Sequence, residues 1–403
     1  MRHLYIALPV INENELLPEV FRCISRQSFR DFTVFVCVNQ PEEWWDDPGK
    51  VSICEENQAT LKWLSNQEIQ HLVIIDQASR GNGWIGKKHG VGWARKRVMD
   101  AIVNVAGKND VIVSLDADTT FGEHYFKSII DNFEKHPDAT GISIPYFHRI
   151  PEVQAAARSI LRYEIYMRYY TLNLWRIGSP YAYTALGSAI AVPVWAYNAV
   201  GGMTPKMSGE DFYFLQKLRK FGRLLFYNEE KVYPAARFSS RVYFGTGPAM
   251  IKGDEGDWSS YPIYSSRFFD EVLETYHLIP ALYTTTGENL LINFLKELFR
   301  EADPFEPLRK NASNEKQFAR AFHEKVDGLR ILQYLKRRND DKPSRDELTL
   351  CEFLTFYYPD EANGIRPILD RLSFESSSLA ELDKIRMILF EKETEYQLSS
   401  SLL

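Results

Sequence analysis

The chain has 403 residues, is 45% hydrophobic and 25% charged, and carries a net charge of −6 at neutral pH, which is typical of a globular protein with more than one domain. Its acidic balance argues against a general nucleic-acid-binding protein. The four cysteines show no C-x-x-C spacing and the N-terminus lacks a signal-peptide core, so we predict a cytoplasmic protein, with peripheral contact at the inner face of the cell membrane as the alternative.

The first part of the chain alternates predicted strands and helices. Apolar, β-rich runs predict strands at residues 4–8, 32–38, 71–76, 110–115 and 140–145. Apolar residues at helical spacing predict helices at residues 15–27, 90–105 and 125–136. This alternation predicts a Rossmann-like, mostly parallel sheet with helices on both faces.

Polar side chains lie at or just beyond the carboxyl ends of several of these predicted strands. They are Asn12, Asn39, Asp76 and the pair Asp116 and Asp118. Because ligands of parallel α/β sheets collect at the carboxyl ends of the strands, we expect these residues to lie near one binding site.

The alternation breaks at about residue 151. Residues 152–177 predict a long helix rich in arginine and aromatic residues, and the chain after residue 260 is helical and rich in charge. A segment rich in Gly, Asp and Ser separates the two parts. We therefore predict one α/β domain at residues 1–257, with a nucleotide-binding half (1–120) and an acceptor half (121–257), and a helical domain at 258–403.

The run "VIVSLDADTTF" ends an apolar strand in two aspartates. Asp116 and Asp118 share one side of an extended chain, because alternate residues of a strand point the same way. Two carboxylates at a strand end suit a hard divalent cation, Mg²⁺ or Mn²⁺, which takes its remaining ligands from phosphate and water. The alternative is a solvated turn or a helix cap provided by Asp118.

Three further stretches resemble one known family. The run "IALPVINENELLPEVF", with Pro9, Asn12 and Glu13, resembles the opening of the family 2 glycosyltransferases, which are nucleotide-sugar-dependent enzymes of the GT-A fold. The runs "GSAIAVPVWAYNAVGGM" and "SGEDFYFLQKLRKFG" resemble the acceptor-side block of that family, which ends in an acidic pair ahead of a helix. With the D-x-D, these motifs follow the order of the family from residue 1 to about 250.

The resemblance implies a role for particular residues. Asp211 would be the catalytic base, Glu210 would be a second catalytic residue, and Asp116 and Asp118 would hold the metal. The alternative for Glu210 and Asp211 is a capping role at the start of a helix. Asn39 stands where many members carry an aspartate that contacts the base or ribose. The residues implied to bind the nucleotide sugar are Pro9, Asn12, Glu13, Asn39, Asp76, Lys87, Lys88, Arg95 and Asp116.

Two arginines follow the acidic pair in "ARFSSRVYFGTG". Arg237 and Arg241 lie beside Ser, Gly and Thr, so they could clamp a diphosphate. The alternative is a pair of ordinary surface arginines.

The predicted function is a metal-dependent glycosyltransferase. It would move a sugar, with inversion, from a UDP- or GDP-linked donor to a hydroxyl of a saccharide or glycolipid acceptor, as in polysaccharide biosynthesis. Two alternatives stay open at this point. "LDADTT" also matches the D-x-D-x-T signature of haloacid-dehalogenase-like phosphatases, with Asp116 as nucleophile; the chain could also be a non-catalytic nucleotide-sugar-binding subunit.

Overall fold

The computed structural model describes residues 2–69, 71–207, 209–239, 245–343 and 345–401. The chain forms two compact units. The sheet unit comprises the residues up to 160, residues 185–256 and the residues from 397 onward, and the helical unit comprises residues 161–184 and 257–396. Neither unit is continuous along the chain, whereas the domains predicted from the sequence are; the predicted boundary at residue 257 stays a prediction.

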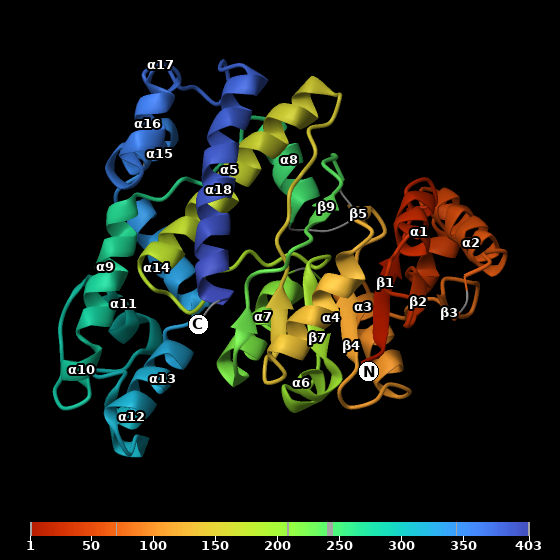
Figure 1. Cartoon of the computed structure of the whole chain (residues 1–403), viewed down its shortest axis with the longest axis horizontal. Coiled ribbons are helices and arrows are strands. Elements are labelled where there is room, and N and C mark those ends of the chain that lie inside the picture. The colour runs from red at the N-terminus through yellow and green to blue at the C-terminus, as the bar shows by residue number, and fades with distance from the viewer. Residues whose placement is uncertain (1, 70, 208, 240–244, 344, 402–403) are drawn as a thin grey trace. The chain divides into compact units, whose positions relative to one another are not determined.

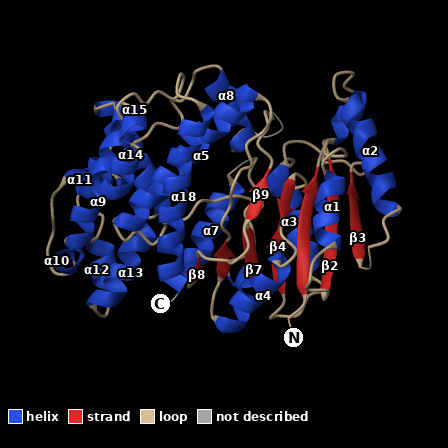
Figure 2. Cartoon of the chain, turned by 45° about the horizontal axis from the view of Figure 1, so that its top comes forward, coloured by secondary structure: helices blue, strands red, loops and turns tan. Residues whose placement is uncertain are grey.

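The sheet unit is built on a seven-stranded sheet, whose strands lie side by side in Figure 2. In spatial order the strands are β3 (Leu72–Gln77), β2 (Phe32–Asn39), β1 (Leu4–Val10), β4 (Val111–Ser114), β7 (Ile190–Pro193), β6 (Gly141–Ser143) and β8 (Leu224–Leu225). Strand β7 runs antiparallel to both of its neighbours, and the other neighbouring pairs are parallel. The predicted mostly parallel sheet is therefore confirmed.

Helices cover both faces of this sheet. The chain steps outward from β1 to β2 and β3 and then returns to β4 on the other side of β1. With right-handed crossovers, this reversal places the helices between β1 and β3 on one face and the helix after β3 on the opposite face. These helices are α1 (Leu17–Ser25), α2 (Val51–Ser65) and α3 (Val91–Val103), and α3 packs on β1 and β2.

The inner strands form where the sequence is almost continuously apolar. In β1, Leu4, Ile6, Ala7 and Leu8 are fully buried, as expected for a strand covered on both faces. The predicted strands at 4–8, 32–38, 71–76, 110–115 and 140–145 are confirmed as β1, β2, β3, β4 and β6, with ends shifted by one or two residues.

Further elements complete the sheet unit. A separate two-stranded sheet pairs β5 (Thr119–Phe121) with β9 (Val232–Pro234) in antiparallel register. The predicted helix at 125–136 is confirmed as α4 (Tyr125–Lys135), and the helix expected after the second acidic pair is α7 (Glu210–Phe221), which begins with that pair. The remaining helices of this unit are the 3-10 helix η1 (Glu42–Asp46), α6 (Val194–Ala199) and α8 (Thr246–Asp254).

The helical unit confirms the predicted helical C-terminal region. Its helices after residue 257 are α9 (Ser266–His277), α10 (Ile279–Leu282), α11 (Leu290–Phe299), α12 (Glu306–Asn311), α13 (Glu315–Lys325), α14 (Gly328–Asp341), α15 (Asp346–Tyr357), α16 (Pro359–Gly364), α17 (Arg366–Leu369) and α18 (Leu379–Ser401). The last residues of α18, from 397 onward, belong to the sheet unit. Within the part of the chain that the structure describes, no helix combines the length and the apolar character needed to cross a membrane.

The long helix α5 (Gln154–Arg176) runs from the sheet unit into the helical unit. Its second part carries a buried ion network. Arg168 donates to Glu164 through Nε at 2.9 Å and Nη2 at 2.6 Å, and through Nη1 to Glu393 of α18. All three side chains are at most 3% exposed, and the equally buried Arg386 of α18 also pairs with Glu164 at 3.4 Å, so these charges depend on one another for neutralisation.

Candidate functional site

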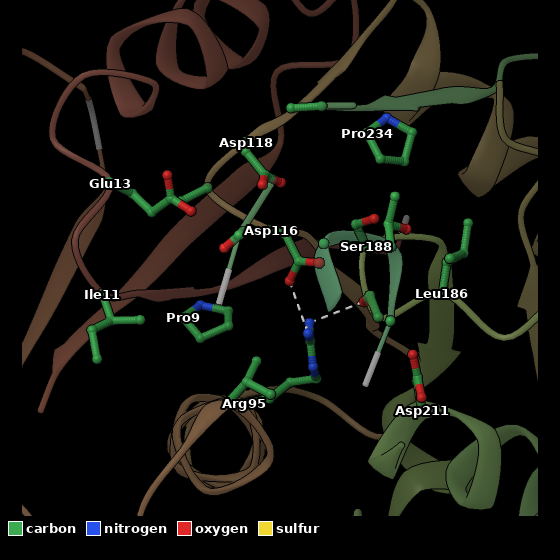
Figure 3. Close-up of a pocket in the computed structure, with 18 of the residues that line it drawn as sticks. Pro9, Ile11, Glu13, Arg95, Asp116, Asp118, Leu186, Ser188, Asp211 and Pro234 are labelled. Atoms are coloured by element: carbon green, nitrogen blue, oxygen red, sulfur yellow. Dashed lines mark hydrogen bonds and ion pairs between the residues drawn. The ribbon is translucent and has the colours of Figure 1, made fainter. Parts of the chain in front are cut away.

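A cavity of about 200 Å³ opens at the carboxyl ends of β1, β2 and β4. The sequence analysis predicted that polar residues gather at this edge of the sheet. Figure 3 shows the side chains that converge there. The residues predicted for the site that line this cavity are Pro9, Glu13, Asn39, Arg95, Asp116, Asp118, Glu210, Asp211 and Arg237. The structure thus gathers residues from opposite ends of the predicted α/β domain.

The two aspartates of the D-x-D occupy the turn between β4 and β5. Each pairs with a different arginine: Asp116 Oδ1 accepts from Arg95 Nη2 at 2.8 Å, and Asp118 Oδ2 accepts from Arg237 Nη2 at 3.0 Å. Burial and the nearby charge of Asp116 raise the pKa of Asp118, and Arg237 opposes that rise. The Asp118 carboxylate therefore lies where additional positive charge would be stabilising.

Arg237 also joins this turn to the end of β1. The same Nη2 atom donates to Glu13 Oε1, and the Glu13 side chain is 5% exposed. The backbone holds the arginine in reach, because β9 pairs with β5 and the Ala235 N–H donates to the Asp118 carbonyl at 3.2 Å. One guanidinium thus neutralises carboxylates that follow two neighbouring strands, β1 and β4.

The second acidic pair stands at the N-terminus of α7. Gly209 precedes it with a φ of +74°, a left-handed conformation that favours glycine and turns the chain into the helix. Figure 3 shows Asp211 rising from this end of α7 toward the cavity. Burial and the charge of Glu210 raise the pKa of Asp211 to about 7, although Arg95 and the Phe212 N–H oppose the rise.

Arg95 of α3 lies beneath the cavity, and its side chain is 2% exposed. Its guanidinium donates to Asp116 at 2.8 Å, to Glu210 Oε1 at 3.2 Å, to Ser114 Oγ at 2.6 Å and to the Gly187 carbonyl at 3.0 Å. The two carboxylates raise the pKa of Arg95 despite its burial. The resemblance implied a donor contact for this residue, whereas its nitrogens are engaged by the protein itself.

Asn39 lines the cavity with an amide that already bridges two segments. Its Nδ2 donates to the Val10 carbonyl at 2.9 Å, and its Oδ1 accepts from Trp84 Nε1 at 3.2 Å. The side chain is buried, so these contacts fix the orientation of the amide at the wall of the cavity.

Other predicted residues do not line the cavity. Asn12 adopts a φ of +53° in the turn after β1. The Asp76 carboxylate accepts from the N–H groups of Ala78 and Ser79 at 3.0 and 2.8 Å, and these hydrogen bonds lower its pKa although burial would raise it. Asp76 therefore organises its own turn.

Lys87 and Lys88 lie on an exposed loop. Neither belongs to the lining of the cavity. Arg241 lies outside the described residues.

The sequence analysis missed several residues of the cavity wall. They include Ile11, Leu186, Gly187, Ser188 and Pro234. A signal existed for two of them, because Gly187 and Ser188 begin the acceptor-side block quoted above. Gly187 is required for a steric reason: a Cβ atom there would lie 2.3 Å from Arg95 Nη2.

Residues 111–246, about a third of the chain, match the family model described as Glycosyl transferase family group 2. This match confirms the resemblance predicted from the sequence and shows that the chain carries a glycosyltransferase segment. No curated protein is found to match the chain.

Among solved structures, TarS of S. aureus in complex with UDP-GlcNAc is similar at 12% identity over 98% of this chain and 92% of that chain, with a TM-score of 0.40. Mannosyltransferase PcManGT from Pyrobaculum calidifontis in complex with GDP-Man and Mn²⁺ is similar at 13% identity over 96% of this chain and 87% of that chain, with a TM-score of 0.37. The family assignment rests on the match at residues 111–246.

Proposed function

We propose that this chain, which carries a segment of glycosyl transferase family group 2, moves a sugar from a nucleotide-diphosphate sugar to an acceptor hydroxyl in a GT-A-type site at the cavity. One observation carries the proposal: the D-x-D after β4 and the acidic pair at the start of α7 line the same cavity, although about 90 residues separate them. A donor-binding group and a candidate base are thus within one site.

The donor would bind along the ends of β1, β2 and β4. Pro9, Glu13, Asn39 and Asp116 line this part of the cavity. The resemblance favours a UDP- or GDP-linked sugar and a saccharide or glycolipid acceptor, in the assembly of a polysaccharide or glycolipid at the cytoplasmic side of a membrane. Asn12, Asp76, Lys87 and Lys88 would act by supporting or covering this region rather than from the cavity wall.

The residues at the D-x-D fit a hard divalent cation. The atoms that would bind the metal are carboxylate oxygens, which suit Mg²⁺ or Mn²⁺. Among the residues that the structure describes, no group of three or more His, Cys, Asp or Glu side chains is arranged to hold a metal; Mg²⁺ commonly uses one or two carboxylates together with the phosphates of its substrate. When bound, the cation would stabilise the negative charge that develops on the leaving diphosphate.

Asp118 is the carboxylate that such a cation would engage first. Asp116 is tied to the buried Arg95, whereas the partner of Asp118, Arg237, is 33% exposed. Arg237 would release Asp118 and then be available to the diphosphate, as a clamp of the kind predicted from the sequence.

Asp211 would act as the base. The acceptor oxygen forms a bond to the anomeric carbon while the bond from that carbon to the diphosphate oxygen breaks, and the hydroxyl proton passes to the Asp211 carboxylate. A single displacement of this kind inverts the anomeric centre. A base with a pKa of about 7 suits this step, because general-base catalysis is most effective near the working pH.

A thermal-shift screen of UDP-, GDP- and TDP-linked sugars with and without Mn²⁺ tests the proposal. We expect one nucleotide class to raise the melting temperature, more strongly with Mn²⁺, and Asp118→Asn to remove the metal-dependent part. The corresponding activity is the release of the nucleoside diphosphate from the same donor, measured in the presence of saccharide or glycolipid acceptors. If no donor shifts the melting temperature and none is consumed, the proposal is wrong.

The two alternative functions find no support. The D-x-D follows β4, the fourth strand along the chain, whereas the phosphatase signature follows the first strand of its fold. A non-catalytic subunit would have no need for an acidic pair at α7 that lines the cavity.

A further inference from the structure

Arg95 connects the donor side of the cavity to the acceptor side. Its Nη2 donates to Asp116, which follows β4, and its Nε donates to Glu210, which begins α7. In a guanidinium group, Nε and Nη2 present their hydrogens along one edge of a rigid plane. Asp116 and Glu210 are therefore held by neighbouring nitrogens of one rigid, planar cation, which limits the spacing of the two carboxylates.

The other end of the guanidinium fixes the strands that flank the site. Arg95 Nη1 donates to Ser114 Oγ of β4 and to the Gly187 carbonyl ahead of β7, and Ser114 Oγ donates to the same carbonyl at 2.6 Å. Ser114 is fully buried. Arg95 thus joins α3 to three other segments of the sheet unit: the end of β4, the residues ahead of β7 and the start of α7.

Two glycines make this arrangement possible. Gly187 leaves the space that Arg95 fills, because a Cβ there would lie 2.3 Å from Nη2 and 2.8 Å from Cζ. Gly92 lies one turn before Arg95 on α3, where a Cβ would lie 2.3 Å from the Lys206 carbonyl oxygen and 3.3 Å from Glu210 Cβ. Neither glycine has a positive φ, so close approach is the reason for both.

We propose that Arg95 is the positioning residue that sets the acidic pair of α7 against the donor-side aspartate, so that sugar transfer depends on it through Asp116 and Glu210. This inference rests on the proposed function and assigns Arg95 a role other than the donor contact that the family resemblance implies. Asp211 follows Glu210 directly, so a displacement of Glu210 also moves the base relative to the donor. Misplacement of reacting groups by about 1 Å can lower a rate by about 10²-fold.

The test uses Arg95→Lys and Gly187→Ala in the full chain. A lysine keeps the positive charge but offers one compact ammonium, which cannot present a planar edge to two carboxylates. The Gly187→Ala variant leaves every charge in place and displaces the guanidinium by steric contact. For both variants we expect kcat to fall by about 10-fold to 10²-fold, with the KM for the donor changed by less than about threefold.

Gly364→Ala is the matched control for the glycine variant. Gly364 lies in α16 of the helical unit, and a Cβ there meets nothing within 4 Å. We expect its kcat and KM to equal those of the unaltered protein. Thermal melting of each variant establishes that it is folded before the kinetics are compared.

A double-mutant cycle separates positioning from a merely structural role. Asp116→Asn and Glu210→Gln are combined, once in the unaltered chain and once with Arg95→Met. If Arg95 couples the two carboxylates, their effects on kcat are non-additive in the first background and additive in the second. The same coupling in both backgrounds, or an unchanged kcat in folded Arg95→Lys and Gly187→Ala, would overturn the inference while leaving the proposed function intact. Absence of donor binding and transfer in the unaltered protein would overturn both.

Discussion

The raised pKa of Asp211 makes a quantitative prediction about the rate of transfer. With a pKa of about 7, about one tenth of this carboxyl is ionised at pH 6 and about nine tenths at pH 8. If the ionised form is the base, kcat/KM rises about tenfold over this interval. The acidic limb of the profile should therefore lie about three pH units above the ordinary aspartate value of 3.8.

Replacement of the base supplies the second part of this prediction. In Asp211→Asn the amide cannot accept the acceptor proton as a base, so we expect the rate to fall by about 10²–10⁴-fold. Asp360→Asn is the matched control, because Asp360 occupies the first turn of α16, is exposed and lies in the helical unit.

Initial rates of nucleoside diphosphate release, measured from pH 5.5 to 9 at acceptor concentrations well below KM so that they report kcat/KM, check both parts. A flat profile between pH 6 and 8 for the unaltered protein would contradict the assignment of Asp211. So would a folded Asp211→Asn variant that retains more than about a tenth of the rate.

Three further predictions concern stability and metal binding. The folded state raises the pKa of Asp211 from 3.8 to about 7, so ionisation of this carboxyl destabilises the fold progressively as the pH rises through that interval. The melting temperature of Asp211→Asn should therefore equal that of the unaltered protein near pH 4 and exceed it by a growing margin up to pH 7. Above pH 7 the margin should stay constant. A constant difference from pH 4 to 8 in thermal melting would refute this. Arg237→Met removes the guanidinium that pairs with the Asp118 carboxylate, so the affinity for Mn²⁺ in the absence of a nucleotide sugar should rise by about tenfold. The electron paramagnetic resonance of free Mn²⁺ measures this affinity. An unchanged affinity would show that Arg237 and the metal do not compete. Arg168→Met removes the cation that pairs with buried Glu393 and one of the two arginines that pair with buried Glu164, whose other partner is Arg386. The free energy of unfolding in urea should therefore fall by about 3–5 kcal/mol, whereas Arg366→Met, which removes an exposed pair, should change it little.

The sequence was sufficient to predict the inner strands and one edge of the site. β1, β2 and β4 are continuous apolar runs, and their ends carry the polar residues that the cavity collects. Strand β7 was not predicted, because its four residues lie within a longer, weakly polar stretch in which apolar and polar residues do not alternate. Strand β8 has two residues, which is too short for any periodicity to register.

The roles of individual polar residues were harder to predict than their location. Asp76 lies at the carboxyl end of β3 and Asp116 just beyond that of β4, yet the Asp76 carboxylate accepts from backbone N–H groups of its own turn. Arg95 and Gly187 are 92 residues apart, and no local pattern indicates that one fills the space left by the other. The sequence therefore identified where polar groups gather, and the tertiary contacts decide which of them face the cavity.

The path of α5 bears on any attempt to dissect the protein into separately expressed parts. A fragment that stops at residue 257 would retain residues 161–176 of this helix but lose their packing partners of the helical unit. Its buried side chains, including Tyr169 and Leu172, would then face water, and Arg168 would lose Glu393. Such a fragment is expected to aggregate, and limited proteolysis near residue 257 should leave the two pieces associated.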